Sequence, residues 1–281
     1  YKRQIKCLPM WLNSRYIFKI LCLVGGLSFM GIATYADRKP RSLAMAEPSE
    51  RIVPDVLPNK PKKNSQATVQ MMQVARGNSR VNTKFREGID VSRYQGVVDW
   101  ARVGNEANVS FVYIKATEGS SLVDPTYAYN IANARQAGLS VGSYHFYRPK
   151  ASVDEQVANM TSVVVKSDQD LVPLIDIETT GGVPNDKFVT DLQEFVERIA
   201  TYYGKKPILY TYQNFYNRHL VGTFKGYHWV MAKYKDEVPL LTDNVDYMMW
   251  QYTQTGRLPG FRGNVDRIRL MGNHNLSALE M

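Results

Sequence analysis

Short apolar runs recur along residues 87–281, and polar or turn-forming residues bound each of them. The runs are rich in β-branched and aromatic residues, as buried strands are. They predict eight strands, at residues 88–91, 111–115, 141–147, 174–178, 208–212, 229–234, 248–252 and 265–270. Five longer segments with helical spacing lie between the earlier strands, at residues 99–108, 126–137, 153–166, 186–203 and 214–221.

Alternating strands and helices predict a parallel sheet. Eight strands with about five helices indicate an α/β fold, a TIM-like (β/α) barrel whose last strands lack helices. A doubly wound open sheet shows the same alternation and stays open as an alternative. In both folds a functional site lies at the C-terminal ends of the strands, and polar side chains gather there: Asp90, Lys115, Glu118, His145, Asp176, Glu178 and Gln251.

The segment Leu-Ile-Asp-Ile-Glu at residues 174–178 is the most informative strand end. Alternation places Asp176 and Glu178 on one face and both isoleucines on the other, with the carboxylate-bearing Cβ atoms about 6 to 7 Å apart. Carboxylates so close raise the pKa of one of them, as cleavage of a glycosidic bond requires. A metal-binding pair, or carboxylates neutralised by arginine, are the competing interpretations. Asp90 ends the first strand and Asp266 begins the last, so a closed barrel would bring both to the same mouth.

Aromatic residues fall at or near the same strand ends: Tyr94, Tyr144, Tyr147, Tyr210, Tyr212, Trp229, Tyr234, Trp250 and Tyr252. Aromatic rings stack on the apolar faces of sugars while hydroxyl and amide groups reach the sugar oxygens, so we expect a carbohydrate groove. Core packing is the alternative for part of this set. Residues assigned to substrate binding are Lys115, Glu118, Tyr144, Tyr147, Tyr210, Trp229 and Gln251. No metal site is expected. We interpret His145 as a hydrogen-bonded strand residue because no second histidine stands at metal-ligand spacing.

The N-terminal part of the chain differs from the rest in composition. Residues 1–86 carry 16 Lys and Arg against 4 Asp and Glu, whereas residues 87–281 carry 19 against 22. The basicity therefore lies outside the patterned part, which argues against a nucleic-acid-binding domain. Both cysteines, Cys7 and Cys22, also precede residue 87, so a disulfide framework or a cysteine nucleophile is excluded from residues 87–281.

An uncharged, mostly apolar run occupies residues 20–35 and follows several basic residues. This pattern is typical of an export signal or a membrane anchor, and a buried core helix is the remaining alternative. Five prolines and a lysine cluster follow, without a sustained apolar period, which predicts a disordered basic linker. The expected organisation is a signal or anchor at residues 1–36, a linker at 37–86 and a barrel domain at 87–281. The expected location is extracytoplasmic, in the cell envelope, either anchored or secreted.

Six ordered motifs resemble those of glycoside hydrolase family 25, the lysozyme (N-acetylmuramidase) family. They are GIDVSRYQG at residues 88–96, FVYIKATEG at 111–119, GSYHF at 142–146, LIDIE at 174–178, ILYT at 208–211 and WQY at 250–252. The resemblance covers residues 87 to about 270. It implies a barrel of eight strands and five helices that cleaves the β-1,4 bond between N-acetylmuramic acid and N-acetylglucosamine in peptidoglycan, without a metal or cofactor.

By position, the resemblance makes Glu178 the proton donor and Asp176 the partner that stabilises charge or orients the substrate's N-acetyl group. Asp90 and Asp266 match supporting acidic positions. Residues 265–270, Val-Asp-Arg-Ile-Arg-Leu, depart from the family pattern by carrying two arginines, which puts the role of Asp266 in question. Whether the acetamido group or water attacks directly stays open.

Three functions remain to be compared. The first is a peptidoglycan muramidase that acts as a monomer on glycan strands and is held at the membrane by its N-terminal segment. The second is a non-catalytic wall-binding protein, which would have no reason to keep a pair of repelling carboxylates. The third is a chitinase-like glycosidase acting on N-acetylglucosamine polymers.

Overall fold

The computed structural model describes residues 80–281 of the chain. The predictions for residues 1–36, and for most of the linker at 37–86, lie outside the described residues. Within residues 80–281, no helix combines the length and the apolar character that crossing a membrane requires.

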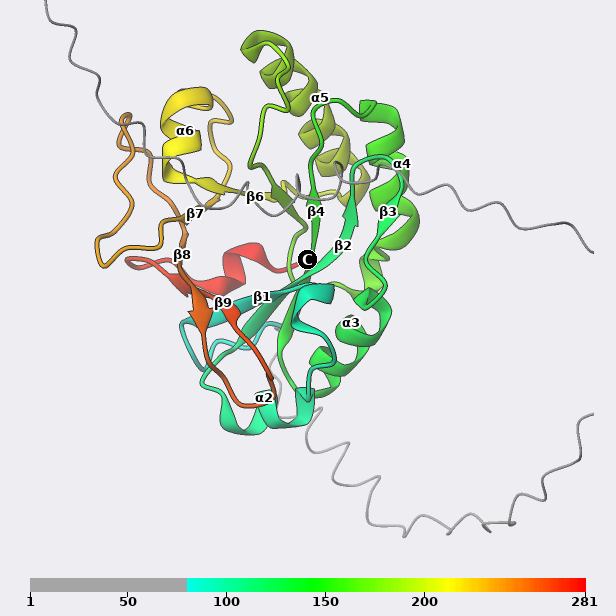
Figure 1. Ribbon diagram of the computed structural model, residues 1–281, viewed down its shortest axis with the longest axis vertical. Helices are drawn as coiled ribbons and strands as arrows, with labels where there is room; N and C mark the ends of the chain where they lie inside the picture. The colour runs from blue at the N-terminus through cyan, green and yellow to red at the C-terminus, as the bar shows by residue number, and fades with distance from the viewer. Residues whose placement is uncertain (1–79) are drawn as a thin grey trace, which may run out of the picture. The chain divides into compact units, whose positions relative to one another are not determined.

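Eight strands of this part close into a barrel (Figure 1). Their bounds are β1 Glu87–Val91, β2 Phe111–Glu118, β4 Ser140–Phe146, β5 Leu174–Asp176, β6 Ile208–Tyr212, β7 Trp229–Ala232, β8 Met249–Gly256 and β9 Val265–Leu270. Neighbouring strands from β1 to β8 are parallel, and β9 closes the barrel because it pairs antiparallel with both β8 and β1. The predicted closed barrel is confirmed, and the open sheet is excluded.

Five helices accompany the strands: α2 Trp100–Glu106, α3 Tyr127–Gln136, α4 Val153–Val163, α5 Asn185–Tyr203 and α6 Gln213–His219. Short 3-10 turns lie at Arg93–Gln95 (η2), Lys166–Asp168 (η3) and Leu276–Leu279 (η4), and β3 Leu122–Val123 adds a two-residue pairing beside β2. Gly204 ends α5, with a left-handed φ of 74° that favours glycine. In Figure 1, α3, α4 and α5 gather on the side of β2 and β4, while β8 and β9 form a hairpin that reaches α2.

Two hydrophobic layers hold the barrel together. Ile175, Ile177 and Phe195 belong to the outer layer, where strands meet helices, and Leu174 and Tyr113 belong to the layer inside the barrel. The predicted alternation along residues 174–178 is therefore correct, because the isoleucines face the helices while Leu174 faces the interior.

Aromatic rings fill the barrel next to glycines on neighbouring strands. Tyr113 lies beside Gly142 in the β2–β4 register, and a Cβ at Gly142 would overlap the Tyr113 ring. The same relation joins Phe111 to Gly88 across β1 and β2. Because these glycines leave room for the rings, the barrel interior is a packed core.

The barrel domain begins before residue 87. Asn82 donates from its side chain to the Gly138 carbonyl at 3.0 Å, and the backbone N–H of Phe85 donates to Ser110 Oγ at 2.6 Å. The Arg86 guanidinium donates to the Leu270 and Gly272 carbonyls at 3.1 and 2.9 Å. Residues 80–86, which we had expected to be linker, thus pack at the end of the barrel where the parallel strands begin.

The two arginines of β9 lie on the face opposite to Asp266. Alternation directs Asp266 and Ile268 toward the interior and Arg267 and Arg269 outward. Both arginines contact Glu87, at 3.2 and 3.4 Å. The departure from the family pattern is therefore confined to the outer surface.

Candidate active site

A cleft of about 220 Å³ opens at the mouth where the parallel strands end. All four predicted catalytic carboxylates line it: Asp90, Asp176, Glu178 and Asp266. Asp90 and Asp266 are register partners across the antiparallel β1–β9 pair, and Asp176 is the last residue of β5. Glu178 lies two residues beyond β5 and is half-buried, whereas Asp176 is buried.

A hydrogen-bond network fixes Asp90. The Gln251 amide donates to Asp90 Oδ2, and Gln251 Oε1 accepts from the Tyr210 hydroxyl at 2.7 Å and from the Tyr234 hydroxyl at 2.6 Å. Because Gln251 is only 2% exposed, these bonds are shielded from competing water. Gln251, predicted to bind substrate, therefore connects β1, β6 and the segment after β7 into one rigid wall of the cleft.

Burial dominates the electrostatics of the carboxylates. It raises the pKa of Asp90 well above the ordinary range, and the neighbouring Asp266 adds to the rise while the Gln251 hydrogen bond opposes it. Burial, followed by repulsion from Glu178, also raises the pKa of Asp176. Asp176 Oδ1 has no hydrogen-bond partner among the described residues. Removing a carboxyl group from water favours its neutral form, so these carboxyl groups keep their protons to higher pH than carboxyl groups in water do.

Glu178 is the carboxyl group whose pKa falls near neutrality. Burial raises its pKa to about 7, with a further contribution from Asp266, whereas Lys115 and a hydrogen bond with Tyr212 oppose the rise. A general acid works best when its pKa lies near the operating pH. Glu178 therefore has the protonation behaviour expected of a proton donor.

Lys115 brings a positive charge to the cleft wall. Its ammonium lies 2.6 Å from Glu118 Oε2 and 5.1 Å from the Phe146 ring centroid, and the side chain is 9% exposed. Glu118 also pairs with Arg148, whose guanidinium lies 4.4 Å from the same ring centroid. Glu118 is therefore held between the cations of Lys115 and Arg148, and both cations also lie near the Phe146 ring.

The structure separates the predicted substrate-binding residues into two groups. Lys115, Tyr144, Tyr210 and Gln251 line the cleft, and Glu118, Tyr147 and Trp229 do not. Tyr147 packs on Phe195 of α5, at 5.3 Å between ring centroids, and Trp229 packs on Tyr216 of α6 at 5.1 Å.

These positions correct the assignment of Tyr147 and Trp229 to a sugar groove, because both face the outer layer. Glu118 does not line the cleft, but it pairs with Lys115, which does. His145 is buried, with Nδ1 2.8 Å from Thr117 Oγ1 and Nε2 3.3 Å from Gln156 Oε1. Within residues 80–281, no three acidic, histidine or cysteine side chains are arranged to hold a metal ion.

Several residues of the cleft were not singled out from the sequence: Ser92, Gln95, Tyr113, Phe146, Gln254 and Ile268. Ser92 and Gln95 form a reciprocal cap on η2, in which Gln95 Oε1 accepts from the Ser92 N–H at 2.9 Å. The Ser-x-x-Gln spacing at residues 92–95 is the sequence signal that could have marked this loop as ordered.

The model of the glycosyl hydrolases family 25 matches residues 89–261. The chain belongs to this family. It is 34% identical over 183 residues to the uncharacterized protein YegX of Escherichia coli (strain K12), covering 64% of this chain and 67% of that protein. It is 31% identical over 208 residues to lysozyme M1 of Streptomyces globisporus, covering 68% and 70%.

The structure of a family 25 glycosyl hydrolase from Bacillus anthracis has the same fold. It superimposes with a TM-score of 0.63 at 29% identity and covers 70% of this chain and 96% of that one. The predicted family and its barrel of eight strands and five helices are thus confirmed.

Proposed function

We propose that the barrel is a muramidase that hydrolyses the β-1,4 bond between N-acetylmuramic acid and N-acetylglucosamine in peptidoglycan. The observation that carries this proposal is the pairing of Glu178, whose pKa is about 7, with the buried Asp176 at one cleft. Membership of family 25 and the 31% identity to lysozyme M1 support the choice of substrate.

In the proposed reaction, Glu178 donates its proton to the glycosidic oxygen as the bond to the anomeric carbon breaks. Positive charge develops on the sugar ring and favours the anionic form of Asp176, which then stabilises that charge strongly in a site from which water is largely removed. Water supplies the hydroxyl group to the anomeric carbon, and its remaining proton returns to the carboxylate of Glu178.

The tyrosines of the cleft suit a sugar substrate. The rings of Tyr210, Tyr212 and Tyr234 form a series, with centroids 6.0 and 5.9 Å apart in edge contacts. Such rings offer flat apolar surface and hydroxyl groups together, which is the combination that sugar rings require. Asp176 Oδ1 offers a free acceptor for a substrate N–H group.

We also propose that the enzyme acts outside the cytoplasm, held at the membrane or secreted. The apolar run at residues 20–35 and the basic residues before it support this location. Glycan strands of the cell wall are then the partner of the barrel, and the membrane is the partner of the N-terminal segment.

The deciding experiment digests purified peptidoglycan with the full chain and with Glu178→Gln, then labels new reducing ends with borohydride for mass spectrometry. Labelled muramitol with the wild type and none with Glu178→Gln is the expected result. Glu155→Gln, an exposed glutamate on α4, is the matched control and should digest normally.

Two other outcomes would replace the proposal. If neither the wild type nor Glu178→Gln yields new reducing ends but both bind the sacculus, the chain is a wall-binding protein. If chitin oligosaccharides are cleaved and peptidoglycan is not, the chitinase-like alternative holds.

A further inference from the structure

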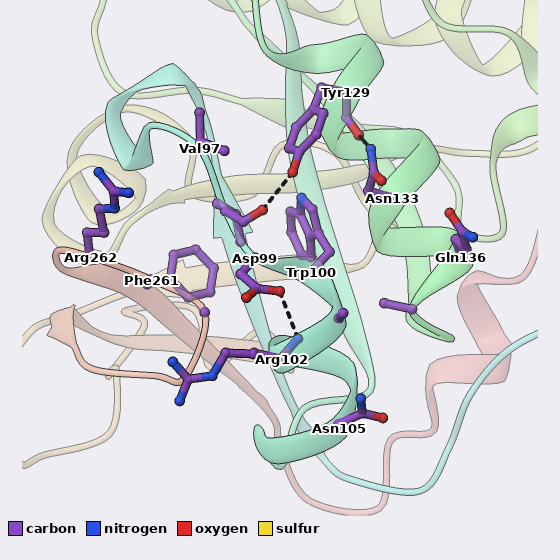
Figure 2. A pocket seen from close by; sticks show the side chains of 14 residues that line it. Val97, Asp99, Trp100, Arg102, Asn105, Tyr129, Asn133, Gln136, Phe261 and Arg262 are labelled. Carbon is purple, nitrogen blue, oxygen red and sulfur yellow. Dashed lines mark hydrogen bonds between the residues drawn. The ribbon is translucent and has the colours of Figure 1, made fainter. Parts of the chain in front are cut away.

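A second depression lies outside the barrel, between α2, α3 and the β8–β9 hairpin. Its volume is about 800 Å³, well above that of the cleft (Figure 2). The proposed hydrolysis uses none of the residues that line it.

Specific contacts build the walls of this groove. The Asp99 N–H donates to the Gly260 carbonyl at 3.0 Å, which ties the hairpin to the start of α2. The Tyr129 hydroxyl donates to the Val98 carbonyl at 2.9 Å, which ties α3 to the same segment. Trp100 is 3% exposed and meets Phe261 edge-on at 6.2 Å. The groove is therefore a preformed surface with an aromatic floor.

The polar groups of the groove are cationic and amide side chains. Figure 2 shows the guanidinium groups of Arg102 and Arg262 on the Phe261 side and the amides of Asn133 and Gln136 on α3. Arg262 makes no ion pair with any residue of 80–281, while Arg102 pairs with Glu106. The one carboxylate in the wall, Asp99, accepts the N–H of Arg102 as a helix cap. A ligand with amide groups and free carboxylates matches this set.

The groove and the cleft are lined by neighbouring residues of the chain. Tyr94 and Gln95 line the cleft, and Val97 lines the groove. Tyr94 and Val97 are 76% and 75% exposed, the highest values among the large hydrophobic residues of the described part. Three Cα steps place Val97 within about 11 Å of Tyr94, and an extended tetrapeptide spans about 13 Å.

We propose that this groove binds the peptide stem of peptidoglycan while the glycan strand occupies the cleft. This inference rests on the proposed muramidase function. In stem-bearing glycan the lactyl carboxyl group of muramic acid is consumed in an amide bond, so the free carboxylates lie on the peptide. The arginines therefore favour the stem over a second glycan strand as the occupant.

The test is a titration of the full chain with the free tetrapeptide stem that an amidase releases from peptidoglycan, followed by NMR. We expect saturable shifts at Tyr129 and Arg262, and a loss of affinity of about fivefold to tenfold in Arg262→Gln, as expected for one charge-assisted hydrogen bond. Arg218→Gln on α6, which removes an exposed arginine outside both depressions, should bind the peptide as the wild type does.

A parallel assay compares hydrolysis of stem-bearing and amidase-treated glycan. Arg262→Gln should lower kcat/KM on the first substrate alone. Equal losses on both substrates, or the absence of peptide binding in a wild type that cleaves glycan, would overturn the inference. Peptide binding is measured without turnover. A failure of this inference can therefore be distinguished from a failure of the muramidase proposal.

Discussion

The cleft and the groove of this barrel differ in what they do to charged groups. The cleft gathers four carboxyl groups in about 220 Å³, and burial is the largest cause of the raised pKa of Asp90, Asp176 and Glu178. The groove is larger, at about 800 Å³, yet the side chain of Arg102 is 56% exposed and already paired. Desolvation, rather than volume, therefore distinguishes a place suited to proton transfer from a place suited to binding.

This contrast separates the expected effects of substitutions. Changes in the cleft should alter turnover and its pH dependence, because they alter protonation states. Changes in the groove should alter affinity for part of the substrate and leave the chemical step unchanged.

After the loss of turnover expected from Glu178→Gln, the largest effect is expected from Asp176→Asn. The amide keeps the size of the side chain but cannot become an anion as positive charge develops, so kcat should fall about 10²- to 10³-fold with little change in KM. Steady-state kinetics on soluble glycan fragments measures it. Asp168→Asn, at an exposed position in η3, is the control. An unchanged kcat in Asp176→Asn would remove Asp176 from the mechanism.

The next effect concerns stability. Gln251→Leu would leave the hydroxyls of Tyr210 and Tyr234 without their acceptor and Asp90 without its donor. Buried groups left unpaired in this way should lower the free energy of unfolding by about 2 to 4 kcal/mol. Denaturant titration measures this change. Asn105→Ala in the groove is the comparison and should change stability by less than about 0.5 kcal/mol. If Gln251→Leu and Asn105→Ala lowered the free energy of unfolding equally, the contrast between the cleft and the groove would be contradicted.

Glu178→Gln should stabilise the protein at pH 8 while abolishing turnover. In the folded protein its pKa is about 7, above the ordinary value of 4.5, so ionisation opposes folding. That cost is absent below about pH 4.5, grows as the pH rises toward 7 and is complete above it. We expect a gain of about 1 to 3 kcal/mol at pH 8 that disappears at pH 4. A destabilised variant at pH 8 would show that Glu178 is better accommodated as a carboxylate.

The last prediction concerns the pH dependence of the wild type. If Glu178 must be protonated, kcat should fall about tenfold for each pH unit above about 7. Lys115 opposes the rise in this pKa, so Lys115→Met should move the falling limb to higher pH. A profile that stays flat up to pH 9 would exclude Glu178 as the acid.

Part of the site follows from local patterns. Alternation along residues 174–178 was enough to place Asp176 toward the interior and Ile175 and Ile177 outward, because successive side chains of a strand point to opposite faces. The closed barrel then brings Asp90 beside Asp266, since one ends a parallel strand and the other begins the antiparallel β9.

Other residues could not be placed in this way. Strands of a barrel covered by helices are apolar on both faces, so an aromatic residue alone does not reveal its side. Tyr147 and Trp229 fit a sugar groove by position and composition, but the packing of Phe195 and Tyr216 directs them outward. Arg267 and Arg269 put the role of Asp266 in question, and only the structure shows that these arginines lie on the other face of β9, where both pair with Glu87.

The sequence by itself determined the family, the barrel and the four carboxylates, because these depend on motifs and on the period of a strand. Only the tertiary structure decided which carboxyl groups lose their water and how Gln251 joins Asp90 to two tyrosines. The groove likewise needed the fold, since residues 97–105, 129–137 and 260–262 meet there from three separate segments. Desolvation and contacts between distant segments arise from packing, and packing is not a local property of the chain.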